Sequence, residues 1–293
     1  MALHGLDRAA APEPAKAKAM LDAIHGSWWN VYIGGPNSGG SGWTPDRVRQ
    51  YVAQGITRFL LIYVGRQEAD VGLLTIAQGR RDGEEACRIA ERFGYGAGTP
   101  LCLDLEAGTF VRSERGSMDY TTGWCRAVRD RGFRPGVYSS PKALTRLARE
   151  DERPDWVWAA KWVGNKFDAR ADPHRVEDLA DNLWGKPGQR VWQYGGKTKD
   201  GRPAVVGGLE VDINVADDGC LAGTSAGAGL VPGGLSMAEA QAILKRMEEI
   251  YDALREGSAT NINSLKNIRD HVVGLERQVA ELKAEVAALK PPR

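Results

Sequence analysis

Short apolar segments alternate with amphipathic segments through residues 1–218, and this alternation limits the folds open to the chain. Strands are predicted at 5–7, 29–33, 59–64, 101–106, 136–139, 156–161, 190–194 and 210–214. Helices are predicted at 44–54, 75–93, 119–131 and 141–150, the first with Thr44 as its N-cap. Strands that alternate with helices are typical of a parallel sheet covered by helices, and eight strands favour an α/β fold of the (β/α)8, TIM-like barrel type over a doubly wound sheet. No helix is expected before the last strand, so the barrel should be irregular there.

Charge and composition argue against several classes of partner. The formal net charge is +1, so no nucleic acid is expected as a partner. The apolar runs stay below the ~18 residues that a membrane-spanning helix needs, so no membrane span is expected. The four cysteines and four histidines show neither zinc-ligand nor disulfide-framework spacing, which predicts no metal site and no other cofactor. No signal peptide is expected, because the first strand begins almost at Met1.

The composition changes after residue 218. Residues 219–235 are rich in glycine, alanine and serine and are predicted to be a flexible linker. Residues 236–293 carry apolar residues at helical spacing and end in heptads whose a and d positions are Leu265, Ile268, Val272, Leu275, Val279, Leu282, Val286 and Leu289. Such heptads indicate a coiled coil, so the chain is expected to associate with itself as a dimer or trimer, unless this segment is one amphipathic helix packed against the barrel. The predicted domains are a barrel at 1–218, a linker at 219–235 and a coiled-coil segment at 236–293.

The predicted strand at 101–106 carries two carboxylates at alternate positions, Asp104 and Glu106. Alternate side chains share one face of a strand and lie about 7 Å apart along it. Two acids on one side of a buried strand are costly unless they are solvated, paired or used in chemistry. Paired carboxylates at about this separation are what the cleavage of a glycosidic bond requires. The alternative is a strand end at which both acids bind backbone or arginine partners.

Two further acids are expected at the same end of the barrel. Asp7 ends the first strand and Asp212 lies in the eighth, and the first and last strands of a closed barrel are neighbours. Four acids at one mouth would raise the pKa of at least one of them through like-charge repulsion, which can keep a carboxylic acid protonated near neutral pH. Further side chains on or just after the strands could bind substrate at this mouth or serve only as barrel wall: Tyr32, Tyr63, Tyr138, Lys161, Trp162, Gln193 and Tyr194.

The strand segments, taken in order, resemble one protein family. They lie at 5–7, 31–36, 62–67, 103–106, 136–140, 158–162, 191–194 and 211–214. Together they resemble the glycoside-hydrolase-like domain of actinobacteria and their phages, which is related to the family 25 lysozymes. The resemblance implies that Glu106 is the general acid, that Asp104, Asp7 and Asp212 shape an anionic pocket, and that cell-wall peptidoglycan is cleaved without a metal.

A glycan-directed barrel with a glycine-rich tether and an oligomerising tail resembles a minor tail protein of an actinobacterial phage. That resemblance implies a place in the virion tail, action at the host cell surface, and other phage tail proteins as partners. The first functional hypothesis is a tail-borne enzyme that hydrolyses cell-wall glycan, with Glu106 as acid and Asp104 or Asp212 as its partner. The second is a catalytically silent module that binds surface glycan or serves as a structural tail-tip protein. The third, a host-secreted wall enzyme, fits poorly with the expected lack of a signal peptide.

Overall fold

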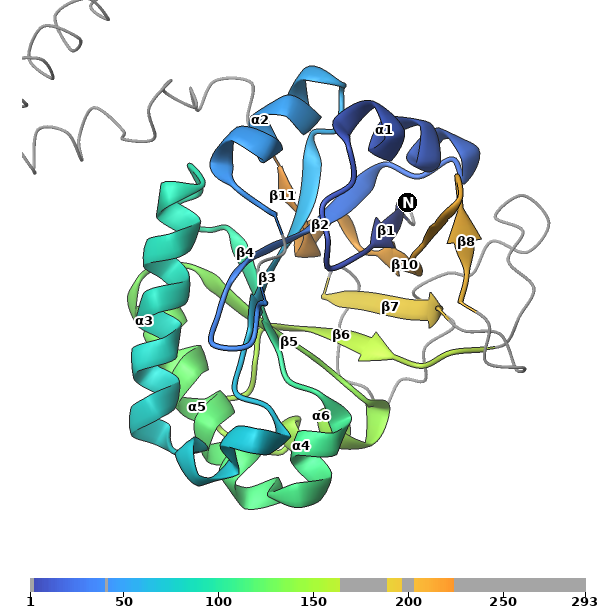
Figure 1. Cartoon of the computed structure of the whole chain (residues 1–293). Helices are drawn as coiled ribbons and strands as arrows, with labels where there is room; N and C mark the ends of the chain where they lie inside the picture. The colour runs from blue at the N-terminus through green and yellow to red at the C-terminus, as the bar shows by residue number, and fades with distance from the viewer. Residues whose placement is uncertain (1–2, 40–41, 164–188, 197–202, 224–293) are drawn as a thin grey trace, which may run out of the picture. The chain divides into compact units, whose positions relative to one another are not determined.

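The computed structural model describes residues 3–39, 42–163, 189–196 and 203–223, and the described chain forms a closed barrel (Figure 1). Neighbouring strands follow the order β3-β2-β1-β10-β7-β6-β5-β4, and β3 pairs with β4 to close the ring. The strands of the ring are β1 Leu3–Asp7, β2 Trp28–Gly34, β3 Arg58–Val64, β4 Pro100–Asp104, β5 Arg134–Ser139, β6 Trp156–Ala160, β7 Arg190–Gly195 and β10 Asp212–Ala216. The prediction of an eight-stranded α/β barrel is confirmed.

Strand β10 is the irregular member of the barrel. It pairs antiparallel with both β1 and β7, whereas the other neighbouring pairs of the ring are parallel. A hairpin of β8 (Val205–Val206) and β9 (Leu209–Glu210) precedes it. Parallel neighbours need a long crossover connection, whereas antiparallel neighbours can follow a shorter one. The short connection through this hairpin thus fits an antiparallel β10, which runs opposite to the last strand of a regular (β/α)8 barrel. The strand predicted at 210–214 is divided between β9 and β10.

Helices lie on the outside of the barrel (Figure 1). They are α1 Pro14–Ala23, α2 Pro45–Ala53, the 3-10 helix η1 Glu68–Leu73, α3 Ile76–Arg92, α4 Ala107–Arg112, α5 Glu114–Asp130 and α6 Pro141–Leu147. Thr44 caps α2 as predicted, because its hydroxyl accepts a hydrogen bond from the Arg47 N–H. Helices α1 and α4 were not expected. Neither has a capping side-chain hydrogen bond, although Pro14 at the first position of α1 is a sequence signal of a helix start. Within the described residues, no helix has the length and apolar character to cross a membrane.

Alternation along the strands divides the apolar side chains between two cores. Leu61 and Leu103 belong to the outer core, which the barrel shares with the helices, whereas Ile62 and Cys102 belong to the inner one. The inner core is filled by large side chains, among them Trp28, Leu60, Trp156, Trp158, Val191 and Leu221. The barrel interior is therefore a packed apolar floor, and polar groups at the strand ends lie on top of it.

The segment after β10 packs against the end of the barrel at which the parallel strands begin. The 3-10 helix η3 (Asp218–Cys220) leads into β11 (Ala222–Gly223), which pairs antiparallel with the start of β3. Cys220 and Leu221 are buried in the inner core. The barrel therefore continues through the first residues of the predicted linker. The coiled coil predicted at 236–293 lies outside the described residues.

Helices α3 and α5 approach each other closely at Gly123. A Cβ at this position would overlap the backbone oxygen of Ile76 in α3. The close approach lets Tyr120 of α5 donate a hydrogen bond of 2.7 Å to Asp82 of α3, a buried carboxylate that also pairs with Arg66 at 3.0 Å. Because Arg66 lies just after β3, this helix contact holds the loop that leads to the mouth of the barrel.

Replacement of Gly123 by alanine should destabilise the protein, although alanine is the better helix former by about 1 kcal/mol. Overpacking of a core costs about 1–3 kcal/mol, and here the added methyl group meets backbone atoms that no side-chain rotation can move. We expect a lower urea midpoint of unfolding. Gly72→Ala is the control, because nothing lies within 4 Å of a Cβ there. Equal midpoints for the two variants would contradict the prediction.

Candidate active site

A single amide side chain, that of Gln193 on β7, joins two carboxyl groups at the mouth of the barrel, the end at which the parallel strands finish. Its Nε2 donates hydrogen bonds to Asp7 Oδ2 and to Asp212 Oδ2, both at 3.1 Å. Its Oε1 accepts hydrogen bonds from the Tyr138 hydroxyl at 3.0 Å and from Trp162 Nε1 at 3.2 Å. The amide thereby makes the two donor and two acceptor contacts that its atoms allow, which fixes its orientation.

Asp7 and Asp212 meet because β1 and β10 run in opposite directions. Asp7 is the last residue of β1, Asp212 is the first of β10, and the two are register partners. The expected closeness of these two acids is confirmed. Asp212 also depends on the small size of Gly196, since a Cβ there would overlap Asp212 Oδ1.

Asp7 is almost fully buried, with 3% of its surface exposed. Burial, and next the charge of Asp212, raise its pKa well above the ordinary value of an aspartate. The Tyr32 hydroxyl, which donates to Asp7 Oδ1 at 3.1 Å, opposes that rise. The like-charge repulsion expected from the sequence is therefore present, but burial over the apolar floor is the larger cause.

Asp104 ends β4, beside Val64 of β3 and Tyr138 of β5. It is 9% exposed, and its Oδ1 has no hydrogen-bond partner among the described groups. Burial raises the pKa of Asp104 to about 8, and the charge of Glu106 contributes to the rise. Asp104 is therefore protonated at neutral pH.

Glu106 lies beyond the end of β4, as the N-cap residue of α4, so this strand ends earlier than predicted. Its side chain reaches solvent, unlike those of Asp7 and Asp104. Partial burial raises the pKa of Glu106, the Ala107 N–H opposes that rise, and Glu68 adds to it. Glu106 is thus a solvent-accessible carboxyl group that holds its proton more tightly than an ordinary glutamate.

Gln67, which was not predicted as a site residue, follows β3 and holds the segment between Asp104 and Glu106. Its Nε2 donates to the Asp104 carbonyl oxygen at 3.1 Å. Its Oε1 accepts from the Glu106 N–H at 3.1 Å and from the Thr109 hydroxyl at 3.0 Å. The only sequence signal for this role is the position of Gln67 just after a predicted strand, because its partners are mostly backbone atoms of another segment.

Six of the seven predicted substrate-binding residues divide into two groups. Tyr32, Tyr138, Trp162 and Gln193 join the hydrogen-bond network of the mouth. Tyr63 and Tyr194 belong to the outer core instead.

The two outer tyrosines hydrogen-bond away from the mouth. The Tyr63 hydroxyl donates to Glu85 of α3 at 2.8 Å, and the Tyr194 hydroxyl lies 3.1 Å from His4 Nδ1. Each is adjacent in sequence to an inward-facing residue and therefore points to the opposite side of its strand. Lys161 follows β6 and is exposed.

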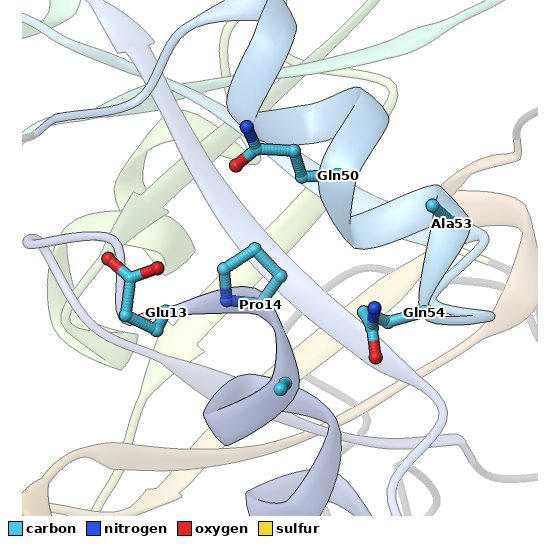
Figure 2. A pocket seen from close by; sticks show the side chains of 6 residues that line it. Glu13, Pro14, Gln50, Ala53 and Gln54 are labelled. Atoms are coloured by element: carbon cyan, nitrogen blue, oxygen red, sulfur yellow. The ribbon is translucent and has the colours of Figure 1, made fainter.

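A surface hollow of about 430 Å³ lies between α1 and α2 (Figure 2). Its acidic lining residue, Glu13, pairs with Arg47 at 3.1 Å. Among the described residues, no three histidine, cysteine, aspartate or glutamate side chains are grouped as metal ligands.

The chain is similar to known proteins in sequence and in fold. Residues 28–216 match the family model of the Rv2525c-like, glycoside hydrolase-like domain, a range that includes Asp104, Glu106 and Asp212. No curated protein matches the sequence. An uncharacterised protein from B. stearothermophilus has a similar fold, with 20% identity and a TM-score of 0.55 over 75% of this chain and 100% of that one.

Two further solved structures are similar at lower TM-scores. The spore cortex lytic enzyme SleM of Clostridium perfringens has 12% identity and a TM-score of 0.49, over 74% of this chain and 68% of that one. The catalytic domain of endolysin ply40 from bacteriophage P40 of Listeria monocytogenes has 16% identity and a TM-score of 0.46, over 74% and 93%.

Asp104→Asn should make stability less dependent on pH. The pKa of Asp104 rises from an ordinary 3.8 to about 8 on folding, so the folded state binds this proton more tightly than the unfolded chain. This group therefore costs the wild type no stability below about pH 4 and destabilises it progressively up to about pH 8, by at most about 1.4 kcal/mol per pH unit. Asparagine does not titrate, so the variant should gain stability relative to wild type as pH rises.

Urea unfolding of both proteins at pH 4, 6 and 8 measures this difference. The exposed Asp22→Asn serves as the control. A constant difference between Asp104→Asn and wild type across this range would refute the assignment of a buried, protonated Asp104.

Proposed function

Because this chain belongs to the family of Rv2525c-like, glycoside hydrolase-like domains, we propose that its barrel hydrolyses cell-wall glycan, with peptidoglycan as the substrate. The observation that carries the proposal is the arrangement of carboxyl groups at the mouth. Asp7 and Asp104 are buried with raised pKa values, while Glu106 reaches solvent. Glycoside hydrolysis needs an accessible protonated carboxyl group and a second carboxylate near the anomeric carbon.

Glu106 is assigned as the general acid. It is accessible to a bound glycan, and its raised pKa favours the protonated form. Glu106 gives its proton to the leaving glycosidic oxygen as the bond from that oxygen to the anomeric carbon breaks. A water molecule supplies the hydroxyl group that the anomeric carbon gains, and its remaining proton restores Glu106.

Asp212 is assigned as the second carboxylate. It is partly exposed, whereas Asp104 is buried and protonated at neutral pH. The strand order places β10 opposite β4 in the ring, so Asp212 and Glu106 approach the mouth from opposite sides. A carboxylate at this place stabilises the positive charge that develops on the sugar ring.

Trp162 is assigned as a sugar-binding side chain. It is 48% exposed, and its Nε1 is held by Gln193. A fixed, half-exposed indole offers a flat apolar face to a sugar ring. This feature needs no proton transfer, so it equally favours the second candidate function, a catalytically silent module that binds surface glycan or serves as a structural tail-tip protein.

We place this activity in the tail of an actinobacterial phage, at the host cell surface and among other tail proteins. The support is the predicted linker and coiled coil together with the point at which the chain leaves the barrel. Gly223 pairs beside Arg58 at the start of β3, at the end of the barrel opposite Asp7 and Asp104. Detection of the protein in purified virions tests this placement, and its absence from them would overturn it.

Glu106→Gln should abolish hydrolysis and leave folding intact. Loss of a general acid costs about 100-fold or more in rate, measured as release of soluble fragments from actinobacterial peptidoglycan by mass spectrometry. Glu84→Gln, a change at an exposed position of α3, is the matched control. If the wild type releases no fragments while Glu106→Gln still binds the wall and Trp162→Ala does not, the silent binding function is correct instead.

The coiled-coil prediction has its own test. The full chain should be a dimer or trimer by light scattering, and a variant with Leu275→Asp and Leu282→Asp should be monomeric, because charges at d positions disrupt the apolar seam. A monomeric wild type would exclude self-association through this segment.

A further inference from the structure

Glu68 lies beside the proposed general acid, in a space that only glycine leaves open. It is the first residue of η1 and directly follows Gln67, whose side chain is bonded to the Glu106 N–H at 3.1 Å. A Cβ at Gly108, in the first turn of α4, would overlap Glu68 Oε1 and lie 2.7 Å from its Cδ. The Glu68 carboxylate is therefore seated against the helix that Glu106 caps.

The charge of Glu68 is not neutralised by an ion pair in the described structure. Arg66, two positions earlier, is engaged by the buried Asp82 at 3.0 Å. No salt bridge of the described residues includes Glu68. A negative charge this close to Glu106 disfavours a second one there.

We propose that Glu68 is a positioning residue for the reaction: its carboxylate, held against Gly108, keeps Glu106 in the proton-donating form. This inference rests on the proposed role of Glu106 as general acid. Once Glu106 has given up its proton, its negative charge lies near that of Glu68, and the repulsion between the two charges favours the return of a proton to Glu106. Glu68 thereby prepares the acid for the next cycle without touching the substrate.

Three titratable groups face Glu106 from the elements around it. They are Asp104 at the end of β4, Tyr138 of β5 and Glu68 of η1. The pKa of the Tyr138 phenol is raised mainly by burial and next by the charge of Glu106. Asp104 is protonated at neutral pH because its pKa is about 8, and a tyrosine is ordinarily neutral there. Glu68 is therefore the neighbour whose charge acts on Glu106 at neutral pH.

The test is a direct titration of the Glu106 carboxyl group by carbon-13 NMR in the full-length protein. Glu68→Gln keeps the shape of the side chain and removes its charge, so the pKa of Glu106 should fall toward that of an ordinary glutamate. Gly108→Ala keeps the charge but displaces the Glu68 carboxylate, so the pKa should fall in the same direction by less. Asp70→Asn on the same 3-10 helix is the control and should leave the pKa unchanged. An unchanged pKa in Glu68→Gln would overturn the proposal.

Hydrolysis gives a second and separate readout. In Glu68→Gln, the alkaline limb of the kcat profile should move to lower pH by the same amount as the NMR pKa, with several-fold lower activity on that limb and little change in KM. A shifted NMR pKa in a protein that cleaves no glycan would support the effect of Glu68 on Glu106 and refute the proposed hydrolysis. A shifted NMR pKa with an unchanged kcat profile would refute the role of Glu68 in the reaction.

Discussion

Strand β10 runs antiparallel to both of its neighbours, and the mouth of the barrel depends on this reversal. Its inward-facing positions include Asp212 at the start and Ala216 at the end. In a parallel β10 the alanine would lie at the mouth and the aspartate at the far end of the barrel. The reversal instead sets Asp212 against Asp7. One amide, Gln193, then bonds both carboxyl groups.

The second constraint is the cost of burying carboxyl groups above an apolar floor. An unpaired buried carboxylate costs several kcal/mol, and the structure limits that cost in two ways. Asp7 receives hydrogen bonds from Tyr32 and Gln193, while Asp104 keeps its proton. Glu106, on the turn into α4, combines a raised pKa with access to solvent. The different properties of these acids therefore follow from how deeply each is buried, more than from how many acids lie at the mouth.

Much of this arrangement could be predicted from the sequence. For some side chains, however, the sequence did not show whether they point into the barrel or outward from it. Asp104, an acid at the end of an apolar segment, marked the inner face of β4, although Glu106 lies beyond the end of that strand. On β7 the polar Gln193 marks the inner face, and its neighbour Tyr194 was nevertheless expected at the mouth as well. On β3 the neighbouring residues are apolar or aromatic, so no such marker exists for Tyr63. Both tyrosines belong to the outer core instead. Gln67 was not predicted as a site residue because it binds backbone atoms of a segment distant in sequence.

The sequence by itself determined the number of strands in the ring, most of their boundaries and the family, because side-chain alternation, helix caps and short motifs are local properties of the chain. The tertiary structure alone decided the direction of β10, the burial that protonates Asp104, and the seat of Glu68 against Gly108. These features depend on groups that folding brings together from distant parts of the sequence. Asp7 and Gln193, for example, are 186 positions apart, yet Gln193 Nε2 lies 3.1 Å from Asp7 Oδ2. A local sequence pattern does not show which distant residues become neighbours, and burial and charge depend on those neighbours in space.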